Sequence, residues 1–191
     1  MPASQKRAKG SPTERADMQK WLHSRPVGGT GDGDPWFSVL VDDRHAFAGG
    51  LAGFVLVDIS DVSDFHAPRV IRTLEGSNGA WGIRIVDDRL YIGSFNGILI
   101  YDISSRSDPV LLGRLLESEE TLGLCLDGNQ LITTVAQGVK ALDISDLDAV
   151  KVLAFFKING GCHAIRCTRG HIYTVRGGLC VLQLRPPARI P

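Results

Sequence analysis

Short apolar runs separated by polar turns make up most of the chain after residue 37. Between residues 81 and 116, for example, apolar runs cover 83–86, 90–93, 98–103 and 110–116, with turns such as Asp87-Asp88-Arg89 between them. Runs of this length, rich in β-branched residues and bounded by Asp, Asn and Gly, predict strands joined by hairpins. No segment between 37 and 184 keeps the 3.6-residue apolar period of a helix. The pattern therefore predicts an all-β chain.

One phrase recurs along the chain. It is FVLVDIS at 54–60, ILIYDIS at 98–104, VKALDIS at 139–145 and a degenerate copy, LCVLQLR, at 179–185. The glycines that open the phrases, at 53, 97, 138 and 178, are 44, 41 and 40 residues apart. Four antiparallel strands in a repeat of about 40 residues make one propeller blade. We therefore predict a β-propeller of about four blades, starting near residues 37, 81, 122 and 163.

The repeated phrase resembles the LVIVD repeat, a family of β-propeller repeats. The matching segments are 53–60, 97–104 with Asp108-Pro109, and 138–145. The fourth copy departs from the pattern, because Gln183 replaces the aspartate and no fourth strand follows Leu184. The resemblance covers about residues 37–185 and implies the propeller fold. It implies little about function, because proteins with these repeats have mostly no assigned activity.

The aspartate of each phrase recurs at the end of a predicted strand and is followed by Ile-Ser. An Asp in this position caps the next turn by accepting backbone hydrogen bonds. We therefore interpret the three as turn caps rather than as a catalytic or metal-binding ring: Asp58, Asp102 and Asp143.

The last repeat ends after its third strand, which leaves the closure of the ring open. Residues 1–18 are polar and are predicted to be disordered, 19–36 combine an apolar stretch at 21–23 with a Gly-rich linker, and 37–191 hold the repeats. The stretch at 21–23 could supply the missing strand and close a four-bladed ring. The alternatives are a half-ring that pairs with a second copy to make eight blades, or a piece of a longer propeller. The closed ring is slightly favoured over the dimer.

Composition excludes several classes of partner and site. Lys plus Arg and Asp plus Glu number 21 each, which argues against nucleic acid and anionic membranes as partners. Without an apolar run of 18 residues or an export signal, we expect no membrane span and a cytoplasmic location. Three of the four cysteines fall in strand patterns, and Cys162 is expected to be more exposed. Their spacing matches no zinc site, so no metal and no cofactor are expected.

A candidate binding surface lies on one face of the predicted propeller. The entry to the first strand and the turn between the second and third strands share that face. Two positions before the apolar residue that marks each first strand, at 39, 83, 124 and 165, stand Phe37, Trp81, Leu122 and His163. One position before it stand small residues, which we expect because the blades converge near the axis: Ser38, Gly82, Gly123 and Ala164. Aromatic side chains mixed with a few polar groups are typical of binding surfaces, although the tryptophans could instead pack between blades. The predicted ligand-binding residues are Trp36, Trp81, Phe95, His163 and Arg176.

The motifs of common enzymes are missing from the sequence. We find no GxSxG, HExxH or P-loop pattern, and we propose no catalytic residue. The sequence favours a non-enzymatic module that binds a protein or peptide, or a second copy of itself. One alternative is an enzyme with His163 as general base near Cys162 and Glu119 or Glu120. Another is a propeller fragment without a function of its own.

Overall fold

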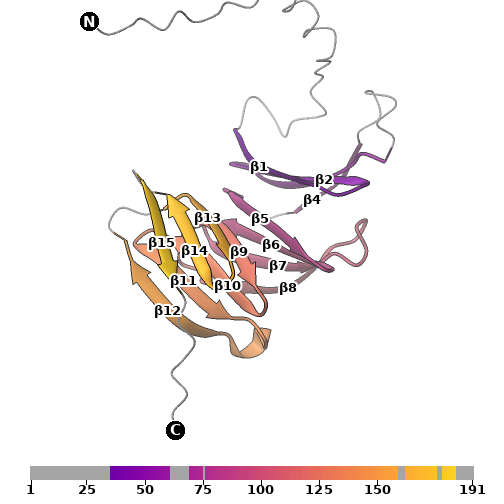
Figure 1. Ribbon diagram of the computed structural model, residues 1–191. Helices are drawn as coiled ribbons and strands as arrows, with labels where there is room; N and C mark the ends of the chain where they lie inside the picture. The colour runs from indigo at the N-terminus through magenta and orange to yellow at the C-terminus, as the bar shows by residue number, and fades with distance from the viewer. Residues whose placement is uncertain (1–34, 61–68, 75, 159–161, 176–177, 184–191) are drawn as a thin grey trace, which may run out of the picture.

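Four antiparallel sheets make up the part of the chain that is described. The computed structural model describes residues 35–60, 69–74, 76–158, 162–175 and 178–183. Three sheets have four strands and the last has three, each in chain order (Figure 1). The predicted all-β propeller of four blades is confirmed. Within these ranges the helical content is one 3-10 turn, Leu147–Ala149, and no helix could cross a membrane.

Each blade runs from an inner first strand to an outer last strand. Blade 1 holds β1 (Trp36–Val41), β2 (His45–Gly50), β3 (Gly53–Asp58) and β4 (Arg69–Leu74), and blade 2 holds β5 (Gly82–Val86), β6 (Arg89–Ser94), β7 (Gly97–Asp102) and β8 (Val110–Leu115). Blade 3 holds β9 (Thr121–Asp127), β10 (Gln130–Val135), β11 (Gly138–Asp143) and β12 (Lys151–Lys157), and blade 4 holds β13 (Ala164–Thr168), β14 (His171–Val175) and β15 (Leu179–Gln183). A β-bulge falls at the same repeat position wherever a third strand pairs with a fourth.

The repeated aspartates end the third strands as turn caps. In each case the Asp Oδ1 accepts a hydrogen bond from the backbone N–H of the serine two residues later. The N···O distances are 2.9 Å at Asp58, 2.8 Å at Asp102 and 3.0 Å at Asp143. This local hydrogen bond holds the turn without help from other blades, and the predicted capping role is confirmed.

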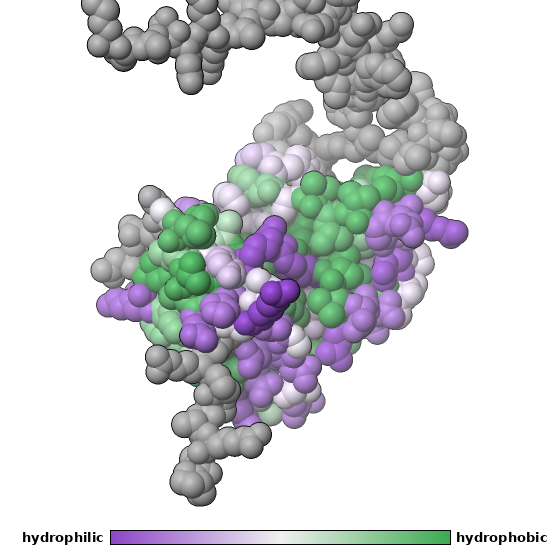
Figure 2. Space-filling view, viewed as in Figure 1, coloured by the Kyte–Doolittle hydropathy of each residue, from purple (hydrophilic) through white to green (hydrophobic). Residues whose placement is uncertain are grey.

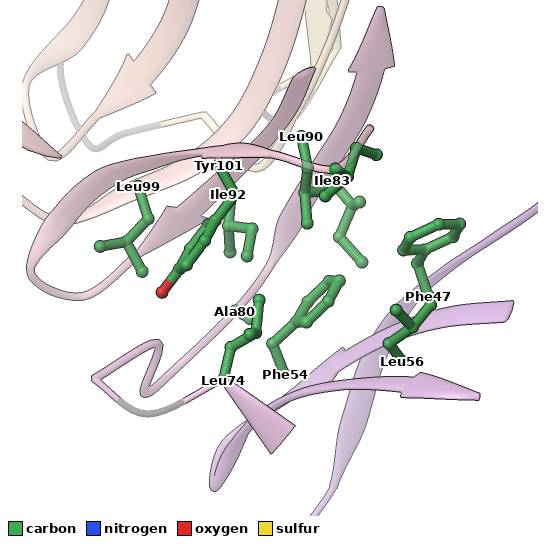
Figure 3. Packing of buried hydrophobic residues seen from close by; sticks show 11 residues of the cluster. Phe47, Phe54, Leu56, Leu74, Ala80, Ile83, Leu90, Ile92, Leu99 and Tyr101 are labelled. Atoms are coloured by element: carbon green, nitrogen blue, oxygen red, sulfur yellow. The ribbon is translucent and has the colours of Figure 1, made fainter. Parts of the chain in front are cut away.

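The hydrophobic core lies between blades, in three separate clusters. Between blades 1 and 2, Phe47 and Phe54 pack toward Ile92 and Leu99 (Figure 3). The second cluster joins blades 2 and 3 through Tyr91, Ile100, Leu124 and Leu142, and the third joins blades 3 and 4 through Ile132, Val139, Ile165 and Ile172. Every blade therefore depends on a neighbour to bury its apolar face.

The first strands of successive blades approach one another closely. A Cβ atom at Gly82 would lie 2.5 Å from the carbonyl oxygen of Leu122 in the next blade. A Cβ at Gly123 would lie 3.0 Å from Cγ2 of Ile165. The expectation that small residues recur at this position because the blades converge is confirmed.

The four blades form an arc that is open between its ends. The packed strand pairs are β1 and β2 against β5, β5 and β6 against β9, and β9 and β10 against β13. In the described ranges no comparable packing joins blade 4 to blade 1, and Figure 1 shows the opening between the yellow and indigo sheets. The predicted disordered segment 1–18 and the proposed closing stretch at 21–23 lie outside the described residues.

Candidate axial binding site

An axial cavity of about 390 Å³ lies where β1, β5, β9 and β13 converge. Each blade contributes the same repeat positions to its wall. The two positions before the apolar start of each first strand supply Phe37, Trp81, Leu122 and His163, then the smaller Ser38, Gly82, Gly123 and Ala164. The prediction that these positions share one face is confirmed.

The predicted ligand-binding residues are only partly brought together. Trp81 and His163 line the axial cavity. Phe95 contacts Trp81, with ring centroids 6.4 Å apart, but is not part of the wall. Trp36 is 43% exposed and lies outside the lining. Arg176 lies outside the described residues.

Trp81 is packed by its rings but keeps an unpaired donor. Its indole stacks on Phe37 with centroids 3.7 Å apart and planes 3° from parallel. The Nε1 atom is shielded from solvent and has no hydrogen-bond partner in the described part of the chain. A buried N–H without an acceptor costs about 1–3 kcal/mol. Trp81 therefore has the packing role considered for it and also a donor that an acceptor could satisfy.

Two arginines line the cavity and were not predicted as site residues. Arg84 and Arg166 hold the same repeat position in blades 2 and 4, and each donates from Nη1 to the carbonyl oxygen of the residue before it, at 2.6 and 2.8 Å. Burial lowers the pKa of Arg84, and the nearby charge of Arg166 lowers it further. None of the described residues in the wall is a carboxylate. The signal in the sequence was a charged residue inside an apolar strand, IRIV in one repeat and IRCT in another.

The groups of the alternative enzyme hypothesis are separated. His163 is exposed at the axial cavity, whereas Cys162 is buried. The prediction that Cys162 is more exposed than the other cysteines was wrong. Glu119 forms an ion pair with Lys140 in a different cavity of about 530 Å³, which Glu120 also lines. Across the described ranges, no three His, Cys, Asp or Glu side chains are grouped to hold a metal ion.

The sequence of blade 2 matches a known repeat. Residues 78–116 match the LVIVD repeat family. This segment contains β5 to β8 entire, so the resemblance stated from the repeated phrase is confirmed for this blade. Blades 1 and 3 share the phrase at 53–60 and 138–145. No curated protein sequence matches the chain.

Solved structures share the fold at low sequence identity. The computationally designed Ika4 protein matches 86% of this chain over 100% of its own length, with a TM-score of 0.63 and 13% identity. The designed Ika8 protein matches 81% of this chain over 47% of its own, with a TM-score of 0.58 and 15% identity. The extracellular domain of BT4673 from B. thetaiotaomicron matches 81% over 21%, with a TM-score of 0.60 and 17% identity. The chain thus spans half or less of these two larger proteins.

Proposed function

We propose that this propeller is a non-enzymatic interaction module that binds a protein or peptide at the axial cavity, through a carboxylate of the partner. The observation that carries the proposal is the charge of the residues that line the cavity. Arg84, Arg166 and His163 line the cavity, and no described lining residue is acidic.

A bound carboxylate would reduce the electrostatic repulsion between the two arginines that line the cavity. Burial and the proximity of Arg166 disfavour the charged form of Arg84, which is why its pKa is lowered. A carboxylate bound near both guanidinium groups accepts charge-assisted hydrogen bonds and cancels their mutual repulsion. The Phe37–Trp81 stack beside them offers an apolar surface for a neighbouring side chain of the peptide.

The first test selects ligands from a phage library of random dodecapeptides. We expect the enriched peptides to contain Asp or Glu, and their Asn or Gln counterparts to bind about tenfold or more weakly, because a hydrogen bond to a charged group contributes roughly 1.5–3 kcal/mol. Peptide affinity should fall by a similar factor in Arg84→Gln and Arg166→Gln. Arg89→Gln is the matched control, because Arg89 is exposed and does not line the axial cavity. Enrichment without acidic residues, or unchanged affinity in both cavity variants, would contradict the proposal.

The second test isolates the indole N–H. Trp81→Phe keeps an aromatic ring but removes Nε1, so the selected peptide should bind several-fold more weakly if its acceptor reaches that donor. Removing an unpaired donor should not lower the free energy of unfolding by itself, although the smaller ring loses some packing. Trp36→Phe is the control, and its peptide affinity should equal that of the wild type. Equal peptide affinities of the wild type and both variants would show that Trp81 Nε1 does not donate a hydrogen bond to the peptide.

A further inference from the structure

We propose that two copies of this chain pair end to end, with blade 1 of each copy packed on blade 4 of the other, to complete an eight-bladed ring. The pairing surfaces are the faces of blades 1 and 4 that no other blade covers in the described part of the chain, which we call the free faces. The proposal does not rest on the peptide site.

The free face of blade 1 is apolar, and the equivalent face of each later blade is buried against the blade before it. By strand alternation and register it carries Val39, Val41, Ala46, Ala48, Val55, Val57, Val70 and Thr73. Val55 is buried, but Val39 is 70% exposed. The residues at the repeat position of Val39 are only 0–2% exposed, because the preceding blade covers them: Ile83, Leu124 and Ile165. Blade 1 therefore has the face for a preceding blade, and no described sheet occupies it.

Blade 4 shows the opposite face, the one that other blades turn to their successor. Tyr173, Leu179 and Val181 lie on it, and the two aliphatic side chains are 68% and 53% exposed. Their counterparts in blade 2 are fully packed against blade 3: Tyr91, Ile98 and Ile100. Even the contact of Arg166 with its own strand repeats that of Arg84. Blade 4 is thus built like a blade that has a successor.

The two free faces can pack on each other. The face of blade 1 is equivalent to the one that blades 2, 3 and 4 pack on the preceding blade, and the face of blade 4 is equivalent to the one that blades 1, 2 and 3 pack on the following blade. Figure 2 shows apolar areas on the side of blade 4 and on the side of blade 1, separated by a hydrophilic strip. Two copies joined head to tail make two identical junctions and close a ring about a two-fold axis. Closure also removes apolar area that a monomer would leave in water.

The shape of the arc favours a second copy over closure within one chain. In the described ranges no packing comparable to that between consecutive blades joins blade 4 to blade 1. The opening between them leaves the apolar faces of both end blades for a second copy to cover.

The first experiment measures the mass in solution by size-exclusion chromatography with light scattering. We expect twice the chain mass of 20.7 kDa. Val41→Glu places a charge on the free face and should give the monomer mass. Val152→Glu is the matched control, because Val152 on an outer strand is 59% exposed against 58% for Val41, and it should stay dimeric. A monomeric wild type, or a dimer that Val41→Glu leaves intact, would overturn the proposal.

A second experiment separates pairing from closure within one chain. By repeat equivalence, residue 164 should meet residue 39 of the partner as Gly123 meets Ile165, where a Cβ at Gly123 would lie 3.0 Å from the isoleucine side chain. Ala164→Cys chains mixed with Val39→Cys chains should form a disulfide-linked dimer on a non-reducing gel, at least tenfold more than either variant oxidised alone. A double variant that oxidises only within one chain would show a self-closed ring and overturn the proposal.

Discussion

At the scale of single residues, the glycine that opens the repeat phrase is needed in blades 2 and 3, where the chain turns tightly against the end of the fourth strand. Gly97 has a φ of 97°, and a Cβ there would lie 2.3 Å from the carbonyl oxygen of Leu115. At Gly138 a Cβ would lie 2.0 Å from the carbonyl oxygen of Phe156. A Cβ at Gly178 would have no atom within 4 Å beyond those of its chain neighbours. The constraint is missing in the same copy that has lost the repeat aspartate.

Gly97→Ala should therefore destabilise the protein strongly, whereas Gly113→Ala should not. The first change combines a disfavoured φ with a clash against backbone that cannot easily move, and we expect a loss of about 2 kcal/mol or more. Gly113 lies in β8 with nothing within 4 Å of its Cβ position, so alanine there should be neutral or slightly stabilising. Urea midpoints of the two variants test this. Similar midpoints would show that the turn at Gly97 relaxes to accept a methyl group.

The Cys125 thiol should make stability depend on pH in the alkaline range. A hydrogen bond with the Cys167 thiol, together with burial, raises the pKa of Cys125 above its ordinary value of 9.0. A raised pKa means that the folded state keeps the proton while the unfolded chain loses it. Its contribution is therefore complete below pH 9 and is lost as the pH rises above it. Urea midpoints at pH 8 and pH 10 should differ less in Cys125→Ala than in the wild type, and an equal difference would contradict this role.

At the scale of elements, a hydroxyl ties β9 of blade 3 to the hairpin between β6 and β7 of blade 2. Thr121 Oγ1 donates to the carbonyl oxygen of Gly97 at 2.8 Å and accepts from the backbone N–H of Ser94 at 3.2 Å. Thr121 and Ser94 are fully buried, so water cannot replace these bonds. The blades are thus joined by polar contacts at the turn as well as by apolar packing.

Thr121→Val should cost about 1–3 kcal/mol of unfolding free energy, because it keeps the shape but leaves the buried Ser94 N–H without its acceptor. The Gly97 carbonyl loses one of two donors and keeps the hydrogen bond from Ser94 Oγ at 2.9 Å. Thr121→Ser retains the hydroxyl and loses one methyl group, so its loss should be smaller. Chemical denaturation of both variants gives the comparison. If valine is tolerated as well as serine, the hydrogen bonds do not stabilise the junction between the blades.

The strands and turns were predictable from the local sequence pattern, whereas the residues that line the axial cavity were only partly predictable. Strand limits, turn caps and the converging small residues follow from spacing and turn chemistry that act within one repeat. The role of Arg84 depends on how the edge of β5 faces the axis, which is fixed only when the blades pack. Trp36 is close in sequence to the lining residue Phe37, but it is the first residue of β1 and lies off the axial lining. The opening of the arc likewise depends on packing between blades.

At the scale of the whole molecule, the blades should differ in local stability because they differ in the number of covered faces. Blades 2 and 3 are packed on both sides, and blades 1 and 4 on one side within the described part of a single chain. In repeat arrays each unit is stabilised by its own folding and by the interfaces with its neighbours. An unpaired chain should therefore open first at its two ends.

Hydrogen exchange can detect this difference and relate it to pairing. In the Val41→Glu chain, amides of β2 and β14 should exchange at least tenfold faster than those of β6 and β10, because opening an end blade breaks one interface rather than two. In the wild type, pairing covers both end faces, so protection of β2 and β14 should rise while β6 and β10 change little. If the variant protects all four strands equally, the chain unfolds as one closed unit and its end faces are covered without a second copy.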